Sequence, residues 1–325
     1  FELPRSSWAD YASERISAGG GIYERGAKSI ALSPQARRSL SIDSELVSGE
    51  ELIRGILRAP VDLLWNGGIG TYVKGSSQSH ADAGDRANDA VRVDARELRA
   101  RIVVEGGNLG LTQAARVELA RAGVRIDTDA IHNSGGVDMS DHEVNYKILL
   151  AGSVADGSLD ASQRSAVLRA CVDDAAEDVL AHNASQSLCL SLDLLRASEA
   201  PERIADAAGF LVRHAELDAT LEGLPEDGHA ASWTRPDLAI LLSYSKLLAK
   251  RALAGSDVID QPALAPLLRS YFPPRLRDAF APALESHRLR REIKALVLVN
   301  RVVDHAGVTL VPELSRTLAV DAGEV

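Results

Sequence analysis

The sequence is poor in sulfur and in aromatic side chains. Its 325 residues include two cysteines and one methionine, and 4% of them are aromatic. Two cysteines are too few for the disulfide framework of a small secreted domain, and Cys171 and Cys189 both lie in segments with a helical pattern. We therefore expect two free, buried thiols and a cytoplasmic protein.

Long hydrophobic runs and clustered positive charge are missing as well. No apolar run approaches the ~20 residues that cross a bilayer, and the first residues do not form a signal-peptide pattern. The formal net charge is −10, and the basic residues are spread along the chain. Nucleic-acid-binding proteins usually concentrate Lys and Arg on one face. We expect neither a membrane nor a nucleic acid as partner.

What the sequence does contain is a regular alternation in residues 102–143. An apolar run, residues 102–104, precedes a glycine turn with Asn108, and Thr112 can cap a helix that Gly123 ends. A second apolar run at 124–126 leads to another turn, Asn133 to Gly136. Ser140 and Glu143 then have the spacing of a capping box, which predicts a further helix starting at Ser140.

A third turn of the same kind lies earlier in the chain. The apolar run 61–65 predicts a strand, and Asn66, Gly67 and Gly68 follow it directly. Turns at the carboxyl ends of strands line the ligand crevice of an open α/β sheet, and glycine lets a ligand approach the backbone. The sequence therefore predicts one shared crevice. Ordinary βα loops remain an alternative, because Gly and Asn favour turns in any case.

From residue 145 onward the sequence reads as one helix after another. The predicted helices cover 162–182, 201–221, 234–248 and 288–305. The predicted fold class is α/β followed by all-α. We expect a partial nucleotide-binding domain at residues 1–143, a helical region at 144–222 and a carboxy-terminal helical domain at 223–325.

Two charged stretches could have other roles. His80, Asp82 and Asp85 lie in a polar loop, and we expect a solvated or lid-like loop there and no metal site. The basic cluster at 287–291 could pair with a neighbouring subunit or domain, or bind an anion. A solvated helix face is the favoured interpretation.

Several motifs resemble the glutamate dehydrogenase superfamily. They are VEGGNLGLT at 104–112 and NSGGVDMSDHE at 133–143. The blocks DLLWNGGIGTYVK, TRPDLAILLSYSK, YFPP and SHRLRREI are similar to the large NAD-specific glutamate dehydrogenases of bacteria. The resemblance extends over nearly the whole chain and is loosest at 150–230. It implies a Rossmann-like nucleotide-binding domain, with NAD as cofactor and oxidative deamination of L-glutamate to 2-oxoglutarate and ammonia as the reaction.

The resemblance also assigns roles to single residues. Asn108 aligns with an asparagine near the nicotinamide ribose, and Asn133 with one beside the nicotinamide and the substrate. Ser140 aligns with a serine that helps to hold the substrate side-chain carboxylate. The remaining cofactor contacts implied by the family are backbone contacts, and they fall on Asn66, Gly67, Gly68, Gly135, Gly136 and Val137.

Other parts of the family pattern are not found. The catalytic lysine, the catalytic aspartate and the glycine-rich pyrophosphate turn have no counterpart, and in family order they would precede Phe1. The chain also begins without methionine. We therefore expect an inactive fragment of a homo-oligomeric enzyme, a tetramer by resemblance, with no catalytic residue in this chain. The acidic residue that distinguishes NAD from NADP is missing too, so NAD is inferred from the family alone.

Two alternatives remain open. One is another amino-acid dehydrogenase of the same superfamily, although the hydroxyl of Ser140 disfavours a leucine-type substrate. The other is a non-catalytic helical module for regulation or oligomerisation.

Overall fold

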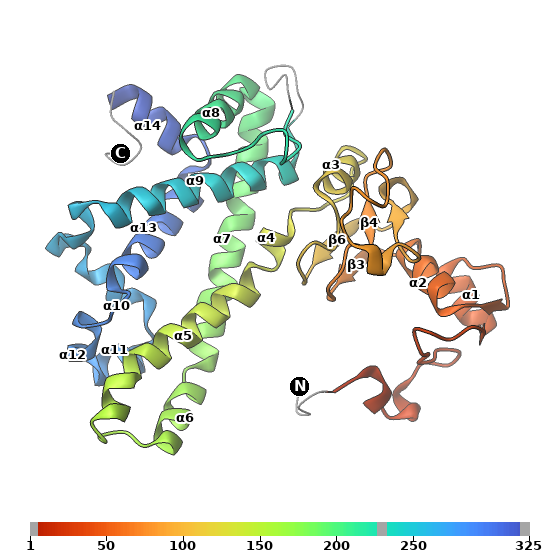
Figure 1. Ribbon diagram of the computed structural model, residues 1–325, viewed down its shortest axis with the longest axis horizontal. Helices are drawn as coiled ribbons and strands as arrows, with labels where there is room; N and C mark the ends of the chain where they lie inside the picture. The colour runs from red at the N-terminus through yellow and green to blue at the C-terminus, as the bar shows by residue number, and fades with distance from the viewer. Residues whose placement is uncertain (1–5, 226–232, 319–325) are drawn as a thin grey trace. The chain divides into compact units, whose positions relative to one another are not determined.

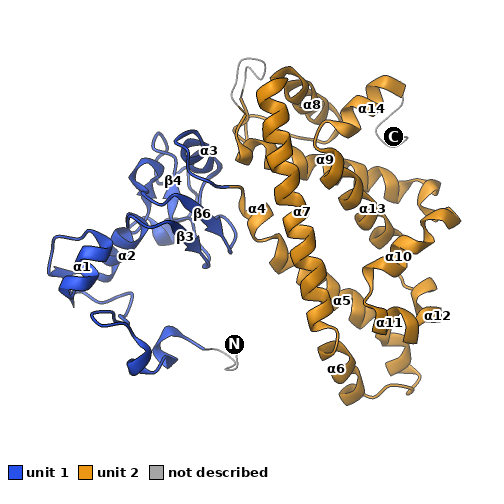
Figure 2. Ribbon diagram, turned by 180° about the vertical axis from the view of Figure 1, so that it is seen from behind, with its two compact units in different colours: residues 1–126 blue, residues 127–325 orange. Residues whose placement is uncertain are grey.

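The computed structural model describes residues 6–225 and 233–318, and these residues form two compact units. Unit 1 comprises residues 1–126 and unit 2 comprises residues 127–325, as Figure 2 shows in blue and orange. Unit 1 contains strands and short helices, whereas the secondary structure of unit 2 is helical. An α/β part followed by an all-α part is the order that the sequence predicts.

The strands of unit 1 are short and pair two by two. β3 (Leu63–Asn66) runs parallel to β6 (Ile102–Glu105), with Leu63 opposite Ile102 and Asn66 opposite Glu105. The other two pairs are parallel β4 (Val73–Lys74) with β5 (Val93–Asp94), and antiparallel β1 (Ile30–Ala31) with β2 (Leu46–Val47). The predicted strand at 124–126 is reduced to one parallel bridge between Arg125 and Ile102.

Three α-helices accompany these strands. They are α1 (Pro34–Leu40), α2 (Gly49–Leu57) and α3 (Gln113–Arg121), and the short 3₁₀ turns are Trp8–Asp10, Ser13–Arg15, Arg86–Asn88 and Ala95–Glu97. Each α-helix begins after a capping residue, because Ser33, Ser48 and Thr112 accept a backbone N–H of the first turn, and the Thr112 cap is as predicted. Val103, Leu111, Ala115 and Leu119 form the buried core between β6 and α3.

Unit 2 is a set of helices around two clusters of buried side chains (Figure 1). Its first helices are α4 (Asp129–His132), α5 (Ser134–Ala155), α6 (Ala161–Arg169), α7 (Val172–Glu199) and α8 (Pro201–His214). The later ones are α9 (Arg235–Gly255), α10 (Ala265–Tyr271), α11 (Pro274–Ala279), α12 (Ala281–Glu285), α13 (Arg290–Ala306) and α14 (Leu310–Leu318), with 3₁₀ turns at Asp257–Asp260 and Pro262–Leu264.

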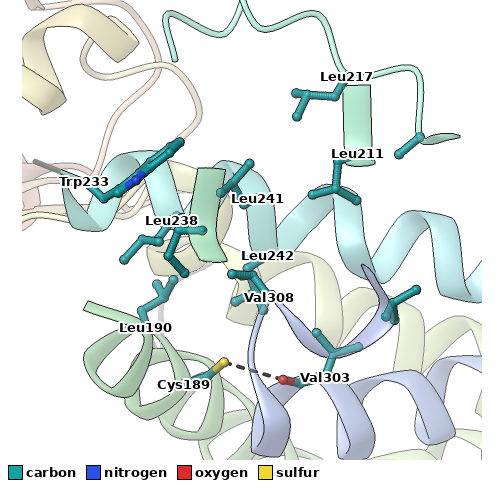
Figure 3. Close-up of a cluster of buried hydrophobic side chains, with 14 of the residues drawn as sticks. Cys189, Leu190, Leu211, Leu217, Trp233, Leu238, Leu241, Leu242, Val303 and Val308 are labelled. Atoms are coloured by element: carbon teal, nitrogen blue, oxygen red, sulfur yellow. Dashed lines mark hydrogen bonds between the residues drawn. The ribbon is translucent and has the colours of Figure 1, made fainter. Parts of the chain in front are cut away.

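Helices α7, α8, α9 and α13 contribute to the first cluster (Figure 3). Leu190, Leu238, Leu241 and Leu242 are completely buried there, and Cys189 donates its thiol to the carbonyl of Val303 at 3.5 Å. Both cysteines are free and buried, as predicted, and burial raises the pKa of the Cys189 thiol to about 12. At neutral pH this thiol is therefore protonated and acts as a small core residue.

Four predictions in unit 2 need correction, and one of them is the helix at 201–221, because α8 ends at His214. The predicted turn at 133–136 and the predicted helix start at Ser140 are wrong, because α5 already begins at Ser134 and runs through Ser140. The helix predicted at 162–182 is two helices, α6 and α7, separated at residues 170–171. The predicted linker at 222–232 lies largely outside the described residues. Among the described helices, no single one is long and apolar enough to span a membrane, and the bent pair α13 and α14 passes that test by length and composition only.

Candidate functional site

The two predicted turns of unit 1 lie side by side at the carboxyl ends of paired strands. β3 ends at Asn66 and β6 at Glu105, and these two residues are opposite each other in the parallel register. The N–H of Gly106 donates to the carbonyl of Asn66 at 2.9 Å, which continues the pairing into the turns. The turns that contain Asn66 and Asn108 therefore lie at the same edge of this strand pair, and the crevice shared with the third turn, Asn133 to Gly136, stays a prediction.

Glycine is required where these turns touch. A Cβ atom on Gly107 would lie 2.6 Å from the carbonyl oxygen of Gly68, and one on Gly110 would lie 2.1 Å from the amide nitrogen of Asn66. Real Cβ atoms do not approach other atoms so closely, so any side chain would push the turns apart. Gly67, Gly68 and Asn108 are exposed to solvent. The paired turns therefore present an accessible surface of backbone and amide groups.

A buried ion pair between Glu105 and Arg116 anchors the second turn, which contains Asn108. Glu105 is completely buried and accepts bonds from Arg116 Nε at 2.7 Å and Nη2 at 2.8 Å. The same carboxylate accepts the backbone N–H of Leu111 at 3.0 Å. It thus ties the end of β6 to helix α3 and to the far side of the turn. Glu105, which carried no assigned role in the sequence, is an anchor of the Asn108 turn.

The first turn has an anchor that the sequence reasoning missed. Asp85 accepts the backbone N–H of Thr71 at 2.8 Å and the amide of Asn88 at 2.6 Å, and Arg25 donates to Asn88 at 2.7 Å. The buried Arg92 donates to the carbonyl of Thr71 at 2.8 Å. The bonds from Asn88 and from the N–H of Thr71 hold the pKa of Asp85 below its usual value. The spacing Asp-x-x-Asn-x-x-x-Arg suits one helical turn and was the available signal.

The other predicted residues share the start of α5 in unit 2. Asn133 ends α4 and precedes the first residue of α5, and its backbone lies at φ −89° and ψ 5°. Gly135 and Gly136 form the first turn of α5, and the N–H of Gly136 donates to the carbonyl of Asn133 at 3.1 Å. Val137, in the next turn, is 61% exposed. These residues thus surround a helix N-terminus, which favours anionic groups.

Ser140 lies elsewhere than predicted. It is the seventh residue of α5, and its exposed hydroxyl donates to the carbonyl of Gly136 at 3.1 Å within the same helix. The expected contribution of Ser140 to the helix N-terminus is therefore wrong. Helix α5 begins at Ser134, six residues earlier, because Asn133 and not Ser140 precedes the helix.

Unit 2 also contains a buried charged network that the sequence analysis did not identify. Lys246 of α9 pairs with Asp304 of α13 at 2.6 Å, and His182 of α7 contacts Asp138 of α5 at 2.7 Å. Burial lowers the pKa of Lys246 and raises that of Asp304. Asp138, His182 and Asp304 line a cavity of about 280 Å³, together with His142. These residues come from four helices, so no local spacing could reveal them.

The structure also shows the contacts of the two charged stretches that were considered for other roles. The carboxylate of Asp82 accepts the backbone N–H of Ser79, and that of Asp85 accepts the backbone N–H of Thr71. Among the residues that the structure describes, no group of acidic, His or Cys side chains could hold a metal ion. In the basic cluster, Arg288 and Arg290 are exposed as expected. His287 is buried and Arg291 binds the carbonyls of residues 254 and 256, so the solvated-face prediction is wrong for these two.

Comparison with protein families gives two matches. Residues 1–193 match the family described as "Bacterial NAD-glutamate dehydrogenase, catalytic domain". Residues 231–325 match the family described as "Glutamate dehydrogenase, C-terminal". The first match includes every predicted site residue, and the second covers α9 to α14.

Curated relatives carry a consistent description. Proteins called NAD-specific glutamate dehydrogenase are 47% identical over 332 residues in Pseudomonas aeruginosa, 44% over 333 in Mycobacterium tuberculosis and 43% over 332 in Halomonas elongata. The alignments cover 100%, 98% and 100% of this chain, but only 20%, 20% and 21% of the relatives. The chain thus spans about a fifth of the length of these relatives.

Proposed function

The chain belongs to the bacterial NAD-glutamate dehydrogenase family, and we propose that it supplies part of the cofactor and substrate site of such an enzyme. The reaction is the oxidative deamination of L-glutamate to 2-oxoglutarate and ammonia. The observation that carries the proposal is the pair of glycine turns that touch at the ends of β3 and β6, within the segment that matches the family.

The family resemblance assigns cofactor contacts to residues of each unit. Unit 1 is the carboxy-terminal part of a Rossmann-like domain, and its turns offer Asn66, Gly67, Gly68 and Asn108 to NAD. The exposed glycines suit this role because a ligand can approach the backbone closely. The family resemblance assigns further nicotinamide contacts to residues 133 and 135–137 at the start of α5. NAD, when bound, accepts the hydride that leaves the substrate.

The substrate contacts are assigned to α5. The N-terminus of a helix favours anionic groups, so the start of α5 can hold a carboxylate. Ser140 adds a hydroxyl one turn further along, and Asn133 adds an amide that can donate and accept. The lysine and aspartate that transfer protons in this family have no counterpart among the motifs of this chain. We therefore expect no turnover from the 325 residues alone.

The assembly and the cell compartment follow from the same assignment. We propose a cytoplasmic homo-oligomer, with a tetramer as the family suggests, that uses neither nucleic acid nor a membrane as partner. Free cysteines and the dispersed basic residues support this proposal. A non-catalytic oligomerisation module is a weaker alternative, because such a module does not need the touching glycine turns.

Glutamate-dependent reduction of NAD by the complete gene product tests the proposal. Asn133→Ala should cut turnover strongly, since a polar partner near the reacting carbon is lost. Ser140→Val should weaken the use of glutamate more than the binding of NAD. Equal losses for both ligands would remove the carboxylate role from Ser140. A complete gene product that oxidises another amino acid and not glutamate would replace the proposed substrate.

A further inference from the structure

We propose that Asn183 of α7 is a positioning residue for Asn133. This inference rests on the proposed function, because the orientation of Asn133 affects catalysis only if Asn133 contacts the nicotinamide and the substrate. Asn183 lies fifty residues further along the chain and belongs to none of the motifs that resemble the dehydrogenases.

The side-chain amide of Asn183 holds both sides of Asn133. Its nitrogen donates to the carbonyl of Ile131 at 2.8 Å and to the hydroxyl oxygen of Ser134 at 2.9 Å. Ile131 belongs to α4 and Ser134 is the first residue of α5. One NH₂ group thus bridges the junction at which Asn133 lies. A carbonyl can only accept a hydrogen bond, so the contact with Ile131 requires the amide nitrogen at this place.

A second amide of α7 supports the same hydroxyl. Gln186 is 6% exposed and donates to Ser134 at 3.3 Å, while its oxygen accepts Lys246 at 3.2 Å. Lys246 is itself paired with Asp304. Gln186 lies three residues after Asn183, so both amides project from one face of α7. The first residue of α5 is therefore fixed by a buried network that continues to α9 and α13.

The conformation of Asn133 explains why such support is useful. Its φ of −89° and ψ of 5° fall in the sparsely populated bridge region, where many active-site residues lie. Backbone hydrogen bonds from its N–H to Asp129 at 2.7 Å and from Gly136 to its carbonyl at 3.1 Å hold it from within the chain. Asn183 adds a side-chain tie from α7 to Ile131 and Ser134, on the two sides of Asn133.

Kinetics of Asn183→Asp and Asn183→Ala in the complete gene product test the proposal. Either change removes the donor, and the loss of about one hydrogen bond at the junction should lower kcat for glutamate roughly tenfold. The KM for glutamate should rise as well. Partial unfolding would lower the apparent kcat but leave KM unchanged. Ser198→Ala is the control, because its exposed hydroxyl bonds only to the carbonyl of Leu195 in the same helix.

A double-mutant cycle and hydrogen exchange complete the test. Ser134→Ala and Asn183→Ala should show non-additive effects on kcat/KM, because both remove the same bond. Additive effects would overturn the proposal. Amide exchange at residues 131–137 should accelerate in Asn183→Ala. Unchanged amide exchange in this variant would overturn the proposal. Faster amide exchange together with wild-type kcat and KM would overturn the proposal as well.

The two proposals fail in different ways. A wild-type gene product that does not oxidise glutamate contradicts the proposed function. Hydrogen exchange at residues 131–137 still decides whether Asn183 holds the junction, because that measurement does not depend on turnover. Wild-type activity with unaltered kinetics in both Asn183 variants contradicts the positioning role alone.

Discussion

Glu105 shows how one buried charge organises a turn of the candidate site. Its side chain is fully buried and that of Arg116 is 5% exposed, so each charge depends on the other. The pair also fixes the backbone at Leu111. A buried ion pair is weak evidence of net stability, but removing one member is costly because it leaves the other charge buried.

We predict that Glu105→Ala destabilises unit 1 by about 3–5 kcal/mol, the cost of leaving a buried charge without its partner. The matched control is Arg101→Ala, which breaks the pair with Asp62 whose two side chains are 81% and 85% exposed. That change should cost less than ~1 kcal/mol. Urea unfolding with hydrogen exchange at residues 101–120 measures both effects. Similar costs for the two variants would contradict the anchoring role of Glu105.

His287 gives a pH dependence to unit 2. Its Nε2 donates to the carbonyl of Asn145 at 3.1 Å, and its Nδ1 accepts the N–H of Leu289 at 3.2 Å. Burial lowers the pKa of His287 below its ordinary value of 6.5. The folded state therefore binds the proton less readily than the unfolded state. Its stabilising contribution is complete above pH 6.5 and decreases as the pH falls toward the folded-state pKa.

We expect protection against hydrogen exchange at residues 284–293 to weaken between about pH 7.5 and about pH 5.5, after correction for the intrinsic exchange rate. His287→Asn retains an acceptor for Leu289 but does not titrate, so it should show a shallower dependence. Some dependence should remain, because burial also lowers the pKa of His142. An identical pH dependence in the variant and the wild type would exclude His287 as the source.

Single residues could be predicted well where their partners are close in sequence. Thr112 caps α3 as predicted, and the helix predicted at 234–248 begins after Thr234, because a cap bonds a backbone group two or three residues away. Ser140 has the same local pattern with Glu143. There, however, the packing of α5 against α7 extends the helix upstream to Ser134, and tertiary packing overrides a local cap signal.

At the scale of elements, the contact between the two turns of unit 1 depends on one glycine more than on its neighbours. Gly107 faces the backbone of Gly68, which cannot move away as a flexible side chain would. Gly68 itself has open space where a Cβ would lie, and its φ is not in the left-handed region.

We predict that Gly107→Ala separates the turns and destabilises unit 1 by about 1–3 kcal/mol, as overpacking typically does. Gly68→Ala adds the same methyl group without a clash and should leave stability within ~0.5 kcal/mol of the wild type. Thermal or urea unfolding of the two variants distinguishes them. Equal stability of both would show that the turns do not touch as described.

The sequence predicted β3, β6 and α3 because each has a local signal, an apolar run before glycine or a cap with helical spacing. It did not predict the anchors of the turns. Asp85, Asn88 and Arg92 act across the fold on Thr71, and their role depends on bonds to a distant backbone. Likewise, the break between α6 and α7 at Cys171 follows from packing, since that residue is completely buried.

For the whole molecule, the order of an α/β part and a helical part was predictable from the change in sequence pattern. The structure divides at residues 126 and 127. The boundaries at 143 and 222 remain predictions for the domains of the longer protein, and α5 runs continuously across position 143. A boundary inside a helix cannot be located from hydrophobic periodicity, because the periodicity does not change there.

The central claim is that the turns at Asn66 and Asn108 bind the nicotinamide cofactor. An experimental structure of the complete gene product with NADH tests it most directly. We predict that Asn108 contacts the nicotinamide ribose and that Asn133 lies beside the ring, with Asn66 to Gly68 under the cofactor. NADH bound away from the β3 and β6 turns would contradict the claim.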